Sequence, residues 1–152
     1  MLTAPQNPAA GLAAVRARIA AATKRAGRDI ADVTLIGVSK GHSAAAISKA
    51  LSFDLVDFGE NYVQEAAAKQ DAVRDPRAIW HFIGALQSNK TRVVADRYAW
   101  VHTIDRLKLA ERLSDQRSAH LLPLNICLQV NLGAEASKGG VPPERVRDLA
   151  LG

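Results

Sequence analysis

Lys40 is the residue whose type and position could support the most distinctive chemistry in this sequence. With Ser39 between them, it follows a short apolar run, Leu35-Ile36-Gly37-Val38, of the kind expected for a strand buried on both faces. A lysine at the end of such a strand would be partly buried, and burial favours the neutral form of an amine. A neutral amine can attack an aldehyde and form a Schiff base. The alternative, from position alone, is a lysine whose stem lies along the strand end while its ammonium group reaches solvent.

Further polar residues follow the later apolar runs, where functional groups gather in parallel α/β proteins. These candidates are Glu60, Asn61, Gly84, Gln87, Ser88, Asn89, Lys90, His102, Thr103, Asp105, Gln129, Asn131, Glu135, Ser137 and Lys138. Asn61, with Gln64 three residues later, reads from the residues alone as a helix N-cap with its capping-box partner. His81 lies inside the run Trp80-His81-Phe82 and reads as a hydrogen-bonded core histidine.

Several common chemistries have no signature here. The sequence has four histidines, His42, His81, His102 and His120, and none has metal-ligand spacing with the carboxylates or with Cys127. No serine nucleophile elbow, dinucleotide-binding glycine motif or phosphate-binding P-loop follows any apolar run. The sequence therefore argues against metal, serine hydrolase, dinucleotide and P-loop chemistry.

The elements that must position these residues alternate along the chain. Strands are expected over residues 33–38, 55–58, 79–83, 100–104 and 124–130. Helices are expected from a cap at Asn7-Pro8 to Gly27, over residues 43–51 and 61–70, across Leu86 to Val94, from a cap at Asp105 across Leu107 to Leu113, and from Pro142-Pro143 to Gly152. Strands that alternate with helices predict βαβ units and a parallel sheet. The expected fold is a partial (β/α) barrel with about five of eight units, and an open doubly wound sheet is the alternative.

Length and charge narrow the class of protein. A chain of 152 residues, 48% of them hydrophobic, predicts a single globular domain over residues 1–152. The net charge is +5, but the basic residues are scattered, and the run Lys90-Thr91-Arg92 is short and has no interleaved aromatics. This pattern argues against nucleic-acid binding. An excess of positive charge suits a small anionic ligand such as a phosphate ester.

Cysteine usage and hydropathy indicate a cytoplasmic location. Cys127 is the single cysteine, so no disulfide can form within the chain, as is usual in a reducing compartment. Residues 1–11 do not have the basic and apolar regions of a secretory signal. No apolar run is long enough to cross a bilayer, so no membrane partner is expected.

Four segments together resemble one known family. They are Gly37-Val38-Ser39-Lys40, then FGENYVQE over residues 58–65, WHFIGALQSNK over residues 80–90, and Gln129-Val130-Asn131 with Glu135, Ser137, Lys138 and Gly140. In type and order these segments are similar to those of the pyridoxal phosphate (PLP) homeostasis proteins, also called the proline synthetase co-transcribed type. The resemblance extends from about residue 10 to the end of the chain.

The resemblance implies a barrel like the N-terminal domain of alanine racemase, with PLP held as a Schiff base on Lys40. Asn61, His81, Gly84, Ser88, Asn89 and Ser137 match motif positions at the cofactor face. Members of the family are regarded as regulating the supply of PLP without catalytic turnover, with PLP-dependent apo-enzymes as recipients of the cofactor. The intact family is expected to be monomeric.

The sequence departs from this family in two ways. Gly41 stands where the family usually has threonine, and the chain ends after the fifth unit, before the last strands and the segment that grips the phosphate. We therefore expect a truncated product, for which self-association through bare sheet edges and inactivity are alternatives. A further alternative is a racemase-type PLP enzyme, which would need a second acid–base group opposite the lysine. In racemases of this fold that group is a tyrosine from another domain, and this chain has only Tyr62 and Tyr98.

Overall fold

Strands and helices alternate along the chain, as the sequence predicts. The structure is a computed structural model that describes residues 8–133, 135 and 137–152. Within these residues the strands are β1 (Ile36–Val38), β2 (Asp57–Glu60), β3 (Ile79–Phe82), β4 (Trp100–Ile104) and β5 (Asn125–Leu128). The α-helices of the same residues are α1 (Pro8–Arg25), α2 (Ala44–Leu51), α3 (Val63–Ala72), α4 (Thr91–Arg97), α5 (Leu107–Gln116) and α6 (Val146–Leu151). Short 3-10 helices span Ile30–Asp32, Ser88–Lys90 and Pro143–Arg145.

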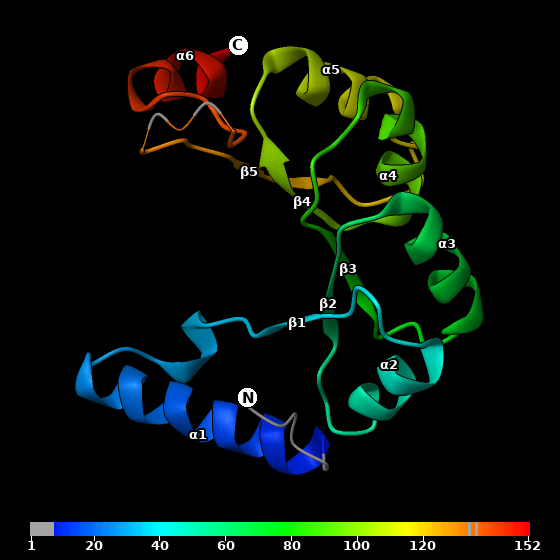
Figure 1. Cartoon of the computed structure of the whole chain (residues 1–152), viewed down its shortest axis with the longest axis vertical. Coiled ribbons are helices and arrows are strands. Elements are labelled where there is room, and N and C mark those ends of the chain that lie inside the picture. Colours follow the sequence, from blue (N-terminus) through cyan, green and yellow to red (C-terminus); the bar gives the residue numbers. More distant parts are fainter. Residues whose placement is uncertain (1–7, 134, 136) are drawn as a thin grey trace.

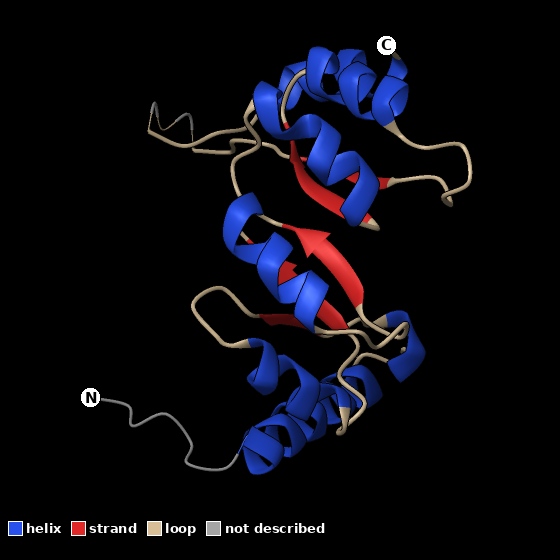
Figure 2. Cartoon of the chain, turned by 90° about the vertical axis from the view of Figure 1, so that its right-hand side faces the viewer, coloured by secondary structure: helices blue, strands red, loops and turns tan. Residues whose placement is uncertain are grey.

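The five strands form one parallel sheet whose spatial order, β1-β2-β3-β4-β5, is the order of the sequence. Helices α2 to α5 lie along one face of this sheet, and α1 and α6 lie at its two ends (Figure 1). In the view turned by 90°, these helices stand in front of the strands (Figure 2). A sequential order with helices on one face fits the expected partial barrel, because a doubly wound sheet reverses its strand order and carries helices on both faces.

The core lies between the sheet and helices α2 to α5. On the strands it is built from Phe58, Phe82 and Val101, each at most 2% exposed, whose side chains alternate with those on the other face. The ring of Phe82 packs edge-on against Tyr98, with ring centroids 5.5 Å apart. The helices contribute buried residues to the same cluster: Ile47, Leu51, Val63, Ala66, Val94, Ala95, Leu109 and Leu113.

The first strand is shorter and less buried than expected. Residues 30–32 form a 3-10 helix capped by Asp29, whose carboxylate accepts a hydrogen bond from the Ala31 amide. The strand starts only at Ile36, and Val38 is 49% exposed. The prediction of a strand buried on both faces was wrong, because β1 is an outer strand and only one of its faces meets helix α2 among the described residues.

Three expected helix starts differ from the structure. The N-cap of α3 is Tyr62 and not Asn61, and the N-cap of α5 is Arg106 and not Asp105. The Asp105 carboxylate instead accepts a hydrogen bond from the neighbouring Arg106 guanidinium. Leu86 is buried, but it lies in the loop before α4.

Helix α1 begins at Pro8 in the structure. The expected cap at Asn7 lies outside the described residues. Among the helices that are described, none combines the length and the apolar character that a membrane span requires.

Candidate functional site

Three of the expected site residues lie at the carboxyl edge of the sheet. Lys40, Asn61 and Gly84 come shortly after β1, β2 and β3, which are neighbouring parallel strands. Backbone hydrogen bonds join these strand ends, from the Ser39 amide to the Gly59 carbonyl and from the Ile83 amide to the Glu60 carbonyl, both 2.9 Å long. The sheet therefore brings the residues that follow these strands to one edge, as the sequence predicts.

Lys40 sits at the tip of a turn. The His42 amide donates to the Ser39 carbonyl over 3.0 Å, and Gly41 has φ +74°. This left-handed conformation is rare for residues with a side chain, and glycine adopts it without steric cost. Lys40 itself is exposed. The expectation of partial burial was wrong, because Lys40 lies at the tip of a turn beyond the strand end, where its side chain faces solvent.

A buried group of charges lies directly beneath this turn. The Glu60 side chain is fully buried, and its Oε1 accepts hydrogen bonds from Ser39 Oγ at 2.6 Å and from Lys69 Nζ at 2.8 Å. Lys69, only 8% exposed, also donates to the Ser39 carbonyl at 2.8 Å. A buried carboxylate is tolerated only with partners of this kind, and here the partners include the residue that precedes Lys40.

Glu65 holds the other side of the turn. Its Oε1 accepts a hydrogen bond from the Gly41 amide at 2.7 Å and lies 2.6 Å from Lys69 Nζ, one helical turn along α3. The hydrogen bonds from Lys69 and then from Gly41 hold the pKa of Glu65 below its usual value of 4.5. Burial by itself would lower the pKa of Lys69, but its bonds to Glu60 and Glu65 outweigh burial and raise the pKa above 10.5.

Lys69 and Glu65 were not among the residues singled out from the sequence. Glu65 ends the segment over residues 58–65 that carries the family resemblance, and the local signal that pairs it with Lys69 is the spacing of an acidic residue four positions before a lysine on a helix. Tyr98, at the end of α4, lies near the same buried carboxylate. Burial and then the charge of Glu60 raise the pKa of the Tyr98 phenol well above its usual value.

Asn61 and Gly84 are in direct contact. A Cβ atom on Gly84 would collide with the backbone of Asn61, so glycine is required for the two loops to approach. The Asn61 Oδ1 atom is buried and has no hydrogen-bond partner among the described residues. Both residues line a cavity of about 440 Å³, together with Tyr62, Gln87 and Lys90. A buried amide oxygen without a partner is a group that a hydrogen-bond donor could satisfy.

The remaining expected residues lie around this edge to different degrees. Ser88 and Asn89 form the 3-10 helix before α4, where the Ser88 carbonyl accepts a hydrogen bond from Thr91 Oγ1. Ser137 is exposed, in the segment that follows β5 at the far end of the sheet. No hydrogen bond in the described residues joins it to Lys40.

His81 lies inside β3, on the sheet face that the helices do not cover. It is 2% exposed, its Nε2 lies 2.9 Å from Asp57 Oδ1, and its Nδ1 lies 2.9 Å from His102 Nε2. Its ring also stacks on Trp100, with centroids 5.8 Å apart. Burial and then His81 lower the pKa of His102, which favours the neutral form. The prediction of a hydrogen-bonded core histidine is confirmed.

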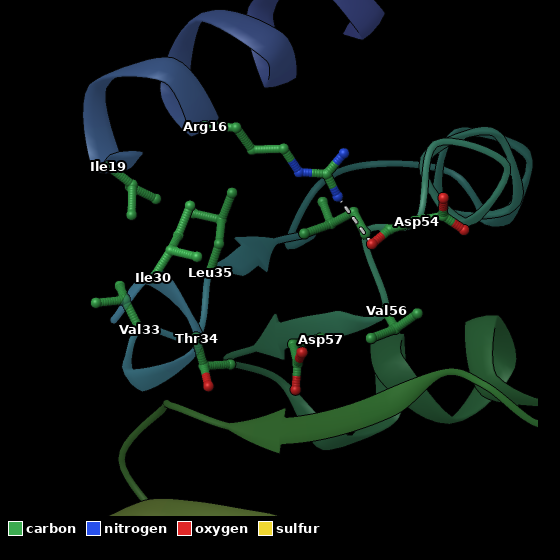
Figure 3. Close-up of a pocket in the computed structure, with 10 residues that line it drawn as sticks. Arg16, Ile19, Ile30, Val33, Thr34, Leu35, Asp54, Val56 and Asp57 are labelled. Atoms are coloured by element: carbon green, nitrogen blue, oxygen red, sulfur yellow. Dashed lines mark hydrogen bonds between the residues drawn. The ribbon is translucent and has the colours of Figure 1, made fainter. Parts of the chain in front are cut away.

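A second cavity, of about 360 Å³, opens at the opposite, amino end of β1 and β2 (Figure 3). Arg16 reaches into it from α1 and donates to the backbone carbonyls of Phe53 and Asp54, each over 2.8 Å. Ile19, Ile30 and Val33 form its apolar side. The cavity lies away from the edge that carries Lys40, and its arginine is already bonded to backbone.

A sequential parallel sheet with helices on one face (Figure 1) defines a barrel-type α/β protein, and an exposed lysine lies at the carboxyl edge of its strands. The chain belongs to the family described as "Alanine racemase, N-terminal domain", whose model matches residues 11–151. The fold expected from the sequence is thereby confirmed.

Two named relatives also confirm the resemblance to PLP homeostasis proteins. The chain is 55% identical over 142 residues to the pyridoxal phosphate homeostasis protein of Pseudomonas aeruginosa, covering 93% of this chain and 62% of that protein. It is 47% identical to the protein of the same name from Escherichia coli, covering 91% of this chain and 61% of the relative. The chain thus spans less than two thirds of the length of these relatives.

A solved structure supports the same relationship. PipY of Synechococcus elongatus, with PLP bound, is 38% identical with a TM-score of 0.72, and the match covers 90% of this chain and 62% of that one.

Proposed function

We propose that this chain is the Lys40-bearing part of a non-catalytic PLP-binding protein that takes part in PLP homeostasis. The observation that carries the proposal is an exposed lysine on a turn whose two flanking residues are held by buried or partly buried charges. Relatives with that name, and a similar structure with PLP bound, support it. Residues 1–152 are proposed to belong to a single barrel domain.

The residues present fit PLP. Lys40 offers a primary amine for the aldehyde, Asn61 offers an unpartnered buried oxygen, and Lys90 adds positive charge beside the cavity that Asn61 lines. Lys40 would hold the cofactor through its primary amine, which could condense with the aldehyde with loss of one water molecule. PLP, when bound, supplies an electron sink. Gly84, Ser88, Asn89 and Ser137 complete the proposed cofactor face, and His81 acts from beneath it through packing, since both its ring nitrogens have partners.

The alternative function is that of a racemase-type enzyme, and one observation supports it. Tyr62 is 63% exposed and follows Asn61 directly, whereas Tyr98 is buried against Phe82. Tyr62 is therefore the tyrosine that could serve as a second acid–base group. Proton exchange at the α-carbon of alanine in D₂O, above that of free PLP and lost in Tyr62→Phe, would establish the enzyme and contradict the carrier.

The proposed carrier works in the cytoplasm, in keeping with the single cysteine, and passes PLP to PLP-dependent apo-enzymes. It is proposed to act without nucleic-acid or membrane partners. The intact protein is proposed to be a monomer, and self-association of this chain is proposed to occur through the outer strands β1 and β5.

The assignment of Lys40 is tested by chemical trapping. The chain is incubated with PLP, reduced with borohydride, digested, and mapped by mass spectrometry. The adduct is expected on Lys40 in preference to Lys49 and Lys138, which are exposed lysines on α2 and after β5. Lys40→Arg should remove that preferred adduct. An even distribution of adducts over the exposed lysines would contradict the proposed function.

A further inference from the structure

We propose that Glu65 is a positioning residue for Lys40, which it orients by holding the backbone amide of Gly41. The inference rests on the proposed function of Lys40. Glu65 does not belong to the residues expected at the cofactor face, and it acts on Lys40 only through the turn.

The geometry places a support on each side of the lysine. Two hydrogen bonds hold Ser39: its hydroxyl donates to Glu60, and its carbonyl accepts from Lys69. The Gly41 amide donates a hydrogen bond to the Glu65 carboxylate. Lys69 Nζ in turn lies 2.6 Å from Glu65 Oε1. Lys69 therefore joins both supports, and helix α3 carries Glu65 and Lys69 on one face, four residues apart.

This arrangement fixes the direction in which Lys40 leaves the sheet. With both neighbours held, the backbone of Lys40 cannot rotate freely, and only its side-chain torsions remain to be ordered when the amine reacts. Gly41, with φ +74° and no atom close to the position of a Cβ, has no packing of its own to hold it. The bond to Glu65 is thus the side-chain contact that holds the exit of the turn within the described residues.

Glu65 can be removed without exposing a buried charge. Its side chain is 37% exposed, and in its absence Lys69 keeps Glu60 and the Ser39 carbonyl as partners. Glu60, by contrast, is fully buried, and its removal would disturb the core. Positioning and folding are therefore separable at Glu65. Glu65→Ala removes the acceptor, and Glu65→Gln keeps an acceptor oxygen for Gly41 without the charge.

The first experiment measures the turn itself, with no PLP present. Amide hydrogen exchange at Gly41, followed by NMR, should be about tenfold faster in Glu65→Ala than in the wild type, because a charge-assisted bond is lost at a partly exposed site. Glu65→Gln should restore most of the protection. Glu111→Ala is the matched control, since Glu111 is an exposed glutamate on α5. An unchanged exchange rate at Gly41 in Glu65→Ala would overturn the inference.

The second experiment measures the consequence for Lys40. The ratio of borohydride-trapped PLP on Lys40 to that on Lys49 should fall about tenfold in Glu65→Ala, recover in Glu65→Gln, and stay unchanged in Glu111→Ala, at a temperature at which all variants are folded. A preserved ratio in Glu65→Ala would overturn the positioning role even if Gly41 exchanges faster. Wild-type protein without preference for Lys40 would refute the proposed function, and the exchange experiment would then decide the role of Glu65 in the turn by itself.

Discussion

The tripeptide Ser-Lys-Gly occurs twice in this chain, and the two copies have very different surroundings. Residues 39–41 follow the outer strand β1, and residues 137–139 come after the outer strand β5. Ser39 is 5% exposed and is bonded to Glu60, whereas Ser137 is exposed. The serine of the first copy is thus buried and hydrogen-bonded, whereas the serine of the second copy is exposed. Because the three residues are the same, the difference comes from elements elsewhere in the chain.

The difference lies in the chemistry of the supports. The first copy is held by two carboxylates and an ammonium group from β2 and α3. The second is held by neutral amides, from Gln129 Nε2 to the Gly139 carbonyl at 2.9 Å and from Asn131 Nδ2 to the Lys138 carbonyl at 3.3 Å. Charge-assisted hydrogen bonds are stronger than neutral ones, and more so when they are buried. Four experiments with substituted chains can break or sharpen this comparison.

The largest effect is expected from Lys69→Met. It leaves the fully buried Glu60 carboxylate with Ser39 Oγ as its remaining side-chain partner among the described residues, and breaking a buried pair in this way costs about 3–5 kcal/mol. Urea denaturation measures the loss. Lys108→Met on α5, where the lysine is exposed, is the control, and the double variant Lys69→Met/Glu60→Gln should recover part of the stability. A loss below about 1 kcal/mol would mean that the charges do not anchor the first copy.

The next largest loss of stability is expected from a substitution of the glycine that ends the first copy, compared with the glycine that ends the second. Gly41→Ala forces an alanine to adopt φ +74°, which costs about 1–2 kcal/mol. Gly139→Ala, at the equivalent place in the second copy, meets only the Gln129 and Asp105 side chains, at 3.4 Å or more, and should change stability by less than about 0.5 kcal/mol. Thermal unfolding of both variants compares them. Equal losses would show that the turn conformations do not differ in strain.

The alternation of strands and helices, the sheet and the edge that carries Lys40 all follow from sequence patterns. Apolar runs of strand length between helical stripes specify parallel units, and units of this kind place functional residues at the carboxyl ends of strands. Lys40 could be found because it ends such a run. The exposure of Lys40 could not be predicted, because burial of the second face of a strand depends on which elements pack against that face of the sheet.

The supports of Lys40 escaped prediction for a related reason. Ser39 and Lys69 are 30 positions apart in the sequence, so no local sequence pattern predicts their contact. Asn61 was assigned to the helix N-cap because local preference favours it there, whereas the close approach of Gly84 fixes its backbone and Tyr62 occupies the cap. Contacts between elements overrode local preference at both places.

A smaller effect is expected from Asn131→Ala in the second copy. This substitution removes the hydrogen bonds from Asn131 Nδ2 to the Glu135 and Lys138 carbonyls, which are neutral and exposed. The global cost should be about 1 kcal/mol or less. Trypsin cleavage after Lys138 should accelerate, while cleavage after Lys40 in the same sample serves as the internal reference. Equal acceleration at both lysines would indicate general loosening and not a local support.

The smallest effect is expected in the pH dependence of stability. Because the folded protein holds the pKa of Glu65 below 4.5, this carboxylate stabilises the native state above that pH, and its contribution is lost as the pH falls through the folded pKa. Glu65→Gln should therefore flatten the fall in melting temperature between about pH 5 and about pH 3, while Glu135→Gln, an exposed glutamate beside the second copy, should leave it unchanged. Lys69 acts with the opposite sign, because its raised pKa stabilises the native state below 10.5 and that contribution is lost at higher pH. Identical acid limbs in wild type and Glu65→Gln would mean that Glu65 is not bonded to the first copy in solution.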